Sequence, residues 1–235
     1  MLKIENLSKS YGEKLAVNNV SLEISEGEIF AFIGHNGAGK TTTIKCAVGI
    51  LSFDEGRVTL NGINLLDNPL EFKKMVAYIP DNPDLYNALT GIQYLEFVSE
   101  VYKIDKSERI ENIKYYSDMF ELTQSLGNLI SSYSHGMKQK LAVISAFIRK
   151  PKLLILDEPF VGLDPKASFK VKEIMKEMCK AGSMVFFSTH VLEVAEKLCD
   201  KVAIIKNGQI IISGTMDEVK GASSLEEVFL ETVDE

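Results

Sequence analysis

The amino-acid sequence predicts an α/β protein whose core is a parallel sheet with helices on both faces. Three observations support this prediction. The first 65 residues read as short strands, residues 83–150 read mainly as helices, and strands alternate with helices beyond Pro151. Strands that alternate with helices are typical of a parallel sheet that is buried on both sides.

The N-terminal part is rich in predicted strands. Gly12, Gly27 and Gly56, together with the turn pair Asn61-Gly62, separate short runs that are rich in apolar residues. Such punctuation indicates strands joined by tight turns. We therefore expect strands at residues 2–7, 17–24, 28–33 and 57–60.

The middle of the chain changes to a helical pattern after Pro80 and Pro83. Apolar residues such as Ile110, Ile113 and Phe120 recur there at helical spacing, which predicts helices at 91–102, 106–120 and 134–148. We therefore expect one domain over residues 1–235. Its core, residues 1–82 and 151–235, is interrupted by a helical subdomain at 83–150.

The C-terminal part alternates between the two kinds of element. We expect strands at 153–156, 184–188, 202–205 and 209–213, with the last two joined by the turn pair Asn207-Gly208,. Helices are predicted at 166–181 and 191–198, and the terminal stretch SLEEVFLET reads as an amphipathic helix,. Strands and helices therefore continue to alternate to the end of the chain.

Composition excludes several classes of protein. With 46% hydrophobic and 25% charged residues, the 235-residue chain resembles ordinary globular proteins and not disordered or fibrous ones,. A net charge of −7 argues against a nucleic-acid partner,. No stretch approaches the roughly 18 apolar residues of a membrane span, and the N-terminus lacks an apolar signal region,. We therefore expect a cytosolic protein.

A phosphate-binding motif follows the predicted strand at 28–33. The sequence GHNGAGKT begins at Gly34 and leads into a predicted helix, which is the context that this motif requires,. Its glycines let backbone amides converge on phosphates, Lys40 reaches the β- and γ-phosphate oxygens, and the Thr41 hydroxyl can bind Mg²⁺. The candidate residues are Gly34, Asn36, Gly37, Ala38, Gly39, Lys40, Thr41 and Thr42.

Two carboxylates follow the apolar strand predicted at 153–156. Asp157 and Glu158 stand where that strand ends, at the edge of a parallel sheet where α/β proteins bind ligands,. We expect Asp157 to hold the metal, directly or through water, and Glu158 to accept a proton from the attacking water. The two motifs together indicate a nucleoside triphosphatase.

Two classes of triphosphatase fit poorly. The Asn-Lys-x-Asp sequence with which GTPases read guanine is absent, and the chain has only three arginines, Arg57, Arg109 and Arg149, where a small-molecule kinase needs an arginine-rich lid. Other residues must therefore identify the class.

Four further motifs stand in a characteristic order along the chain. Ser134 and Gly136 lie in YSHGMKQ, with Ser134 23 positions before Asp157, and Asp164 lies in PFVGLDP. His190 follows Ser188-Thr189, and Tyr11 lies in SKSYG. With the two motifs above, they resemble the ATP-binding subunit of an ABC transporter over essentially the whole chain.

This resemblance implies a P-loop NTPase (RecA-like) core with an N-terminal antiparallel β subdomain and an inserted α-helical subdomain. It implies an ATPase that uses ATP and Mg²⁺. Tyr11 would stack on adenine, and His190 would donate a hydrogen bond to the γ-phosphate. Ser134, Gly136 and Asp164 would contact ATP held by a second chain, in a head-to-tail dimer of identical or related subunits.

The chain departs from the family pattern at three positions. Asp81 follows Tyr78-Ile79-Pro80 where the family usually has glutamine. The segment YSHGMKQ corresponds to the family's signature sequence, usually LSGGQ, and there His135 replaces the first glycine and Met137 the final glutamine. A carboxylate adds negative charge near the metal. Our hypothesis is that Asp81 reaches Mg²⁺ and increases the dependence on it.

The resemblance also implies an integral-membrane permease partner that docks near residues 81–87 and holds the chain at the inner face of the membrane. The signature and the terminal SLEEVFLET look most like the branch that exports antibiotics, peptides or lipids. One alternative is an ABC-type ATPase that acts on ribosomes or chromosomes without a permease. A second alternative is a permease-linked sensing complex.

Overall fold

The largest sheet of the protein has six strands. The computed structural model describes residues 1–234, with side chains through residue 232. Strand order is β10-β9-β3-β8-β7-β6; the strands from β9 to β6 run parallel, and β10 is antiparallel to β9. They are β3 (Ile29–Ile33), β6 (Val76–Ile79), β7 (Leu153–Asp157), β8 (Met184–Thr189), β9 (Lys201–Lys206) and β10 (Gln209–Thr215). The predicted parallel sheet is confirmed.

A second, antiparallel sheet is formed by the N-terminal strands. Its order is β2-β1-β4-β5. The strands are β1 (Leu2–Tyr11), β2 (Lys14–Ile24), β4 (Glu55–Leu60) and β5 (Ile63–Asn64). Three of the strands predicted in residues 1–65 lie in this sheet, and the fourth joins the six-stranded sheet as β3. The predicted α/β fold with an antiparallel β section is therefore correct.

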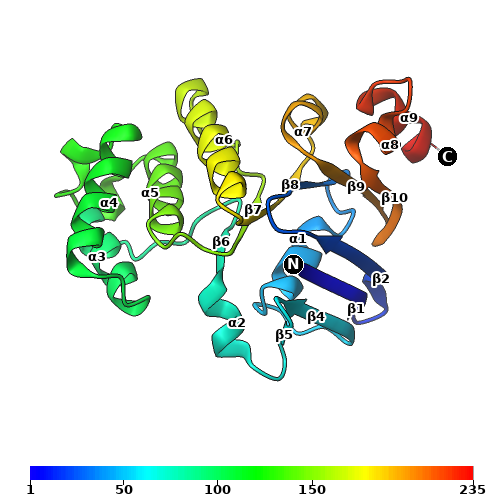
Figure 1. The fold of residues 1–235 in the computed structure, drawn as a ribbon, viewed down its shortest axis with the longest axis horizontal. Helices are drawn as coiled ribbons and strands as arrows, with labels where there is room; N and C mark the ends of the chain where they lie inside the picture. Colours follow the sequence, from blue (N-terminus) through cyan, green and yellow to red (C-terminus); the bar gives the residue numbers. More distant parts are fainter. Residues whose placement is uncertain (235) are drawn as a thin grey trace.

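Helices cover both faces of the six-stranded sheet, as predicted. Helix α1 (Lys40–Ala47) packs between the two sheets, and α6 (Pro165–Lys180) and α7 (Leu192–Leu198) lie on the opposite face (Figure 1). Successive side chains of β3 alternate between these layers. Phe30 and Phe32 pack with α1, whereas Ala31 packs with α6 and α7. Every residue of β3 and β7 is therefore buried.

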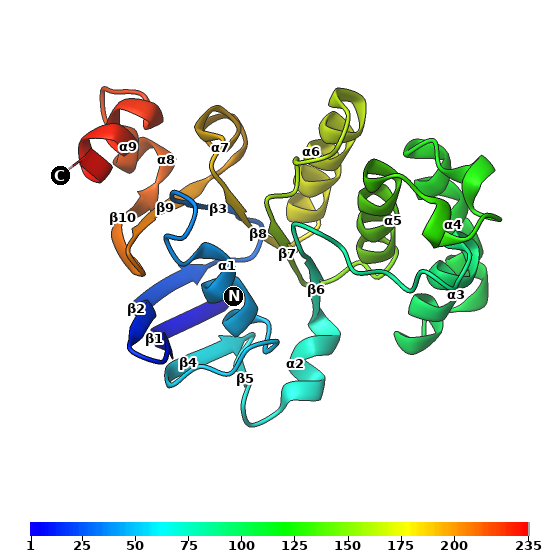
Figure 2. The ribbon, with the colours of Figure 1, turned by 180° about the vertical axis from the view of Figure 1, so that it is seen from behind.

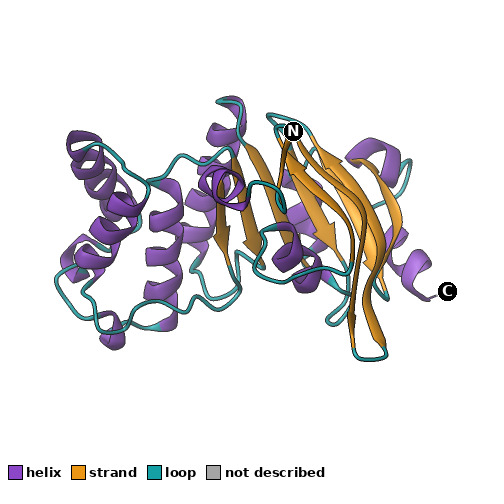
Figure 3. Cartoon of the chain, turned by 90° about the horizontal axis from the view of Figure 1, so that it is seen from below, coloured by secondary structure: helices purple, strands orange, loops and turns teal. Residues whose placement is uncertain are grey.

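Three helices form an arm at one end of the molecule, away from most of the strands (Figure 3). They are α3 (Gly91–Val101), α4 (Lys106–Met119) and α5 (His135–Phe147), with short 3₁₀ turns at Thr123–Ser125 and Ile130–Ser132. All three helices were predicted. Side-chain caps fix their starts: Thr90 accepts a hydrogen bond from the amide of Gln93, and Ser134 accepts one from the amide of Met137,.

Arg149 joins the arm to the six-stranded sheet. It follows α5, and its Nη2 atom donates a hydrogen bond of 2.5 Å to the carbonyl of Val76 at the start of β6. The guanidinium carbon lies 3.4 Å from the centroid of the Tyr102 ring, which follows α3. A stacked arginine combines cation–π attraction with this hydrogen bond. One side chain therefore contacts both an arm helix end and a sheet strand.

Some short elements were not predicted. Helix α2 (Pro69–Met75) buries only Phe72 and leads directly into β6, so neither element has a long apolar pattern. Helix α8 (Met216–Lys220) is also short. The predicted C-terminal helix is present as α9 (Leu225–Asp234), which lies with α8 beside β10 (Figure 2). Within residues 1–234, no helix has the length and apolar character of a membrane span.

The core of the six-stranded sheet is expected to depend on Phe186. This side chain is fully buried in β8, and its ring centroid lies 5.7 Å from those of Phe30 and Phe32. Phe186→Ala should lower the free energy of unfolding by about 3–5 kcal/mol, because the cavity cannot collapse between two covered layers. The exposed Phe169 provides a matched control, and Phe169→Ala should change stability by only about 0.5 kcal/mol,. Urea unfolding followed by circular dichroism measures both; equal losses would contradict this account of the core.

Candidate active site

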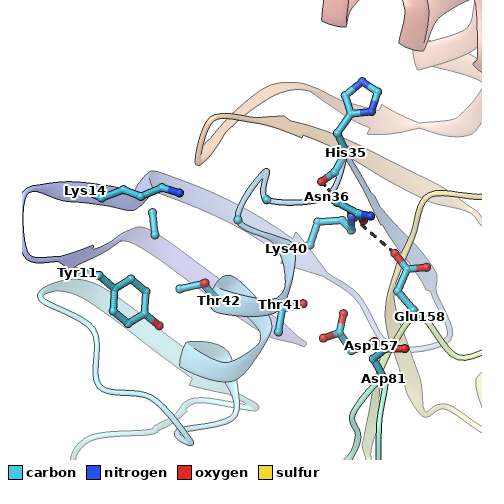
Figure 4. Close-up of a pocket in the computed structure, with 13 residues that line it drawn as sticks. Tyr11, Lys14, His35, Asn36, Lys40, Thr41, Thr42, Asp81, Asp157 and Glu158 are labelled. Carbon is cyan, nitrogen blue, oxygen red and sulfur yellow. Dashed lines mark hydrogen bonds and ion pairs between the residues drawn. The ribbon is translucent and has the colours of Figure 1, made fainter.

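A cavity of about 320 Å³ lies at the carboxyl ends of β3 and β7. Figure 4 shows its lining. Residues from the N-terminal sheet, the glycine-rich loop, the loop after β6 and the end of β7 meet there. The predicted site residues that line it are Tyr11, Asn36, Gly37, Gly39, Lys40, Thr41, Thr42, Asp81, Asp157 and Glu158. The sequence did not identify Lys14, Ala16 and His35, which also line it.

The glycine-rich loop adopts a backbone that other residues rarely adopt. Gly37 and Gly39 have φ angles of +84° and +110°. A Cβ atom on Gly39 would lie 2.6 Å from the carbonyl oxygen of Ala16, and one on Gly34 would lie 2.5 Å from that of Ile205. These glycines therefore allow the loop to pass close to neighbouring backbone. Gly34 does not line the cavity itself, nor does the buried Ala38.

Helix α1 begins where this loop ends. Its first residue is Lys40, and its N-cap is Gly39. No side chain caps the helix. The amides of its first turn thus face the cavity side without a side-chain acceptor, which is the arrangement that phosphate-binding helix termini use.

Lys40 supplies a buried positive charge. Its side chain is only 6% exposed, and its Nζ atom donates hydrogen bonds to the carbonyls of Gly34 (2.6 Å) and His35 (3.3 Å). Nζ also lies 3.6 Å from Oε1 of Glu158 (Figure 4). A buried ammonium requires partners of this kind. The loop therefore holds the ammonium group at the side of the cavity where the carboxylates lie.

The oxygen atoms near α1 fit a hard divalent cation. Asp157 ends β7 and is 2% exposed, and with Thr41 and Asp81 it lines the same part of the cavity. Hydroxyl and carboxylate oxygens are typical Mg²⁺ ligands, usually completed by substrate phosphates and water. Within residues 1–234 no group of three or more His, Cys, Asp or Glu side chains could hold a metal alone. The residues thus fit a metal that is bound together with a nucleotide.

Glu158 and His190 come together from two neighbouring strand ends. The Nδ1 atom of His190 lies 3.0 Å from Oε2 of Glu158. The other carboxylate oxygen, Oε1, is buried and makes no hydrogen bond within residues 1–234. His190 does not line the cavity, but it contacts the residue that we expect to be the base. Because Oε1 makes no hydrogen bond beyond its ion pair with Lys40 at 3.6 Å, its lone pairs remain available to accept a proton,.

Ser134, Gly136 and Asp164 lie outside this cavity. Ser134 caps α5 by accepting a hydrogen bond from the amide of Met137. Asp164 caps α6 by accepting a hydrogen bond from the amide of Ala167 (2.8 Å), and it pairs with Lys140 at 2.7 Å. The hydrogen bond from Lys140, followed by that from Ala167, lowers the pKa of Asp164. Within one chain Ser134 and Asp164 therefore act as helix caps, and none of the three residues lines the cavity.

Helix α5 also contacts two loops near the cavity. Gln139, which is 2% exposed, donates a hydrogen bond of 2.5 Å to the carbonyl of Asp81. The ring of His135 lies against Gly162, where an added Cβ would come within 2.6 Å of the ring. Gly162 has a φ of +79°. The side chain that replaces a signature glycine therefore packs against the loop that leads to Asp164.

The two ends of the cavity differ in character. Tyr11 lies at the end remote from Glu158, with Lys14 nearby (Figure 4). The Tyr11 ring is about half exposed, as a stacking residue needs to be,.

His35 points away from Thr41 and Asp157 and packs on Phe229 of α9, with 4.9 Å between ring centroids. The sequence offers no local signal for this contact between distant residues.

Comparison with known proteins identifies the family. The family described as "ABC transporter" matches residues 17–161. The chain is 41% identical to the uncharacterized ABC transporter ATP-binding protein YxlF of Bacillus subtilis, over 94% of this chain and 72% of that protein. It is 34% identical to the ABC-type transporter ATP-binding protein EcsA of the same organism, over 100% of this chain and 97% of the relative.

Solved structures agree with these relatives. A structure described as the ATP binding subunit of an ABC transporter is 35% identical and superimposes with a TM-score of 0.95, covering 99% of both chains. The dimeric structure of MJ0796, a bacterial ABC transporter cassette, is 25% identical with a TM-score of 0.82, covering 92% of this chain and 99% of the other. The chain therefore belongs to the ABC transporter family as an ATP-binding ATPase subunit.

Proposed function

We propose that this chain binds ATP with Mg²⁺ in the cavity, hydrolyses it, and thereby powers a membrane transporter. One observation carries the proposal. The cavity joins the glycine-rich loop and Lys40 to Thr41, Asp157 and Glu158, so that phosphate-binding, metal-binding and proton-accepting groups face one space. Phosphoryl transfer needs mainly such positioning and charge stabilisation.

Each group has a distinct task in this proposal. Lys40 and the amides at the start of α1 bind phosphate oxygens. Thr41, Asp157 and Asp81 would hold Mg²⁺, which when bound neutralises charge on the phosphates. Glu158 accepts the proton of the attacking water through Oε1, which makes no hydrogen bond in the described residues,. His190, whose Nδ1 atom lies 3.0 Å from Oε2 of Glu158, would donate a hydrogen bond to the γ-phosphate.

The proposal includes a second ATPase chain. Ser134 stands at the start of α5, where its hydroxyl, the Gly136 amide and the positive end of the helix can face an anion,. Because these groups lie outside the cavity of their own chain, they would contact the γ-phosphate of ATP held by a partner. Asp164 would lie at the same interface. The partner is a second copy or a related ATPase subunit.

A surface on the arm is suited to a permease. Tyr86, Phe97 and Val101 are all exposed, and the rings of Tyr86 and Phe97 lie 5.7 Å apart. We call these three residues the docking surface. Exposed apolar groups of this size commonly mark protein–protein contacts. The loop at residues 81–87 contains Tyr86 and begins at Asp81 in the cavity. A permease that docks on this surface would hold the chain at the inner membrane face, and the loop would connect transport to ATP.

Export is the proposed direction of transport. Among the relatives is the linearmycin resistance ATP-binding protein LnrL of Bacillus subtilis, which is 33% identical over 93% of this chain and 70% of that protein. A resistance function of that relative favours the exporter branch for this chain. The acidic net charge gives no support to action on ribosomes or chromosomes,. A sensing complex would use the same docking surface.

Glu158→Gln tests hydrolysis. The variant should still bind ATP, remain dimeric with it, and release phosphate at least about a hundredfold more slowly, because the amide cannot accept the proton. Phosphate release and equilibrium dialysis with labelled ATP measure the two steps. Glu173→Gln, on the exposed side of α6, is the control and should keep the unsubstituted rate. An unchanged rate in Glu158→Gln would refute the role of this residue as the base.

Phe97→Glu tests the permease partnership. Introducing a charge on the docking surface should reduce recovery of a multi-span membrane protein from detergent-solubilised membranes at least about tenfold, because the charge would be buried in the contact. Phe169→Glu, at another exposed phenylalanine, is the matched control. Mass spectrometry identifies the recovered proteins. Recovery of ribosomal proteins or DNA in place of a multi-span protein would favour the alternative without a permease.

A further inference from the structure

Asp157 and Glu158 are adjacent, yet the proposed reaction needs both near the same phosphates. In an extended strand, successive side chains point to opposite faces of the sheet. At Glu158 the backbone leaves the extended conformation, with a φ of +50°, so its side chain is not forced to the face opposite that of Asp157. This left-handed conformation is unfavourable for residues other than glycine, and it persists only where surrounding contacts enforce it.

Ser188 makes those contacts. It lies in β8, directly opposite Asp157 in the parallel pairing of β7 with β8, and its side chain is fully buried. Its hydroxyl donates a hydrogen bond of 2.5 Å to Oδ1 of Asp157. The Oγ atom of Ser188 also accepts a hydrogen bond of 3.1 Å from the amide of Glu158, and the Ser188 carbonyl oxygen lies 3.3 Å from that amide.

The chemistry of a hydroxyl explains why one side chain can hold both residues. A serine hydroxyl has one proton to donate and two lone pairs that accept. The donated bond occupies Oδ1 of Asp157 and leaves Oδ2 available to a metal ion. The accepted bond fixes the amide of Glu158, and with it the backbone that directs the carboxylate toward Lys40 and His190.

We propose that Ser188 is a positioning residue for ATP hydrolysis, which sets the metal ligand Asp157 and the base Glu158 in their separate orientations. The inference rests on the proposed function of the cavity. Ser188 does not line the cavity and need not touch the nucleotide. Its effect on the reaction passes through the two carboxylates, as is common for residues that orient metal ligands and bases.

Ser188→Ala removes the hydroxyl and leaves the backbone contact in place. Ser99 provides a matched control, because it is also a fully buried serine whose hydroxyl donates a hydrogen bond, in this case to the carbonyl of Leu95 in the arm. Ser188→Thr keeps a hydroxyl at the position. Four quantities are measured for each variant: thermal unfolding, affinity for ADP without metal, affinity of the ADP complex for Mn²⁺ by electron paramagnetic resonance, and the rate of phosphate release.

The proposal predicts a specific pattern. Ser188→Ala should weaken Mn²⁺ binding and slow phosphate release, each roughly ten- to hundredfold, the range for losing a hydrogen bond to a charged group. Its affinity for metal-free ADP should stay within about twofold, because the glycine-rich loop is untouched. Ser188→Thr should recover most of both losses, and Ser99→Ala should show neither.

Three results would overturn the inference. One is normal Mn²⁺ affinity and hydrolysis in Ser188→Ala. The second is a Ser188→Thr variant that is folded and still as impaired as Ser188→Ala, since this would assign the loss to packing. The third is a parallel loss of metal-free ADP binding and thermal stability. Failure of the proposed function is distinguishable, because in that case the unsubstituted chain itself would not hydrolyse ATP.

Discussion

The parallel pairing of β3, β8 and β7, which are covered on both faces, determines where the site residues and the surrounding helices lie. Because these strands run parallel, their carboxyl ends lie at one edge of the sheet, and each of the three leads into a functional segment. Burial on both faces fixes their register. The glycine-rich loop, the carboxylate pair and His190 are thus brought together by strand geometry, although they lie far apart in the sequence.

Where a site residue lies in a motif that follows an apolar strand or ends one, the sequence was sufficient to predict it. Lys40 and Asp157 are of this kind, and both line the cavity. The sequence did not identify Lys14, which lies on the neighbouring sheet, or the contact of His35 with Phe229. Those contacts depend on how the layers pack and have no local pattern. The same holds for β6, whose four residues follow a helix that buries one side chain.

The positions of Ser134 and Asp164 link a nucleotide site shared by two chains to the helical arm. Ser134 and Asp164 cap helices and stand outside the cavity of their own chain, while Lys140 and Gln139 connect α5 to the loops at Asp164 and Asp81. A nucleotide site shared by two chains would therefore be mechanically linked to the arm. The arm in turn carries the docking surface and is attached to the sheet through Arg149. In the proposed complex, movement of the permease and closure around ATP would involve the same helices.

In the proposed function, the phosphates of ATP bind at the edge of the six-stranded sheet through Lys40. Equilibrium dialysis with labelled ATP, comparing the unsubstituted chain with Lys40→Met, tests it most directly. Methionine keeps an unbranched side chain but removes the charge, so the affinity for ATP should fall at least about tenfold, the size expected for a lost charged hydrogen bond, in a variant that is folded by circular dichroism. Equal affinity of the two proteins for ATP would contradict the account.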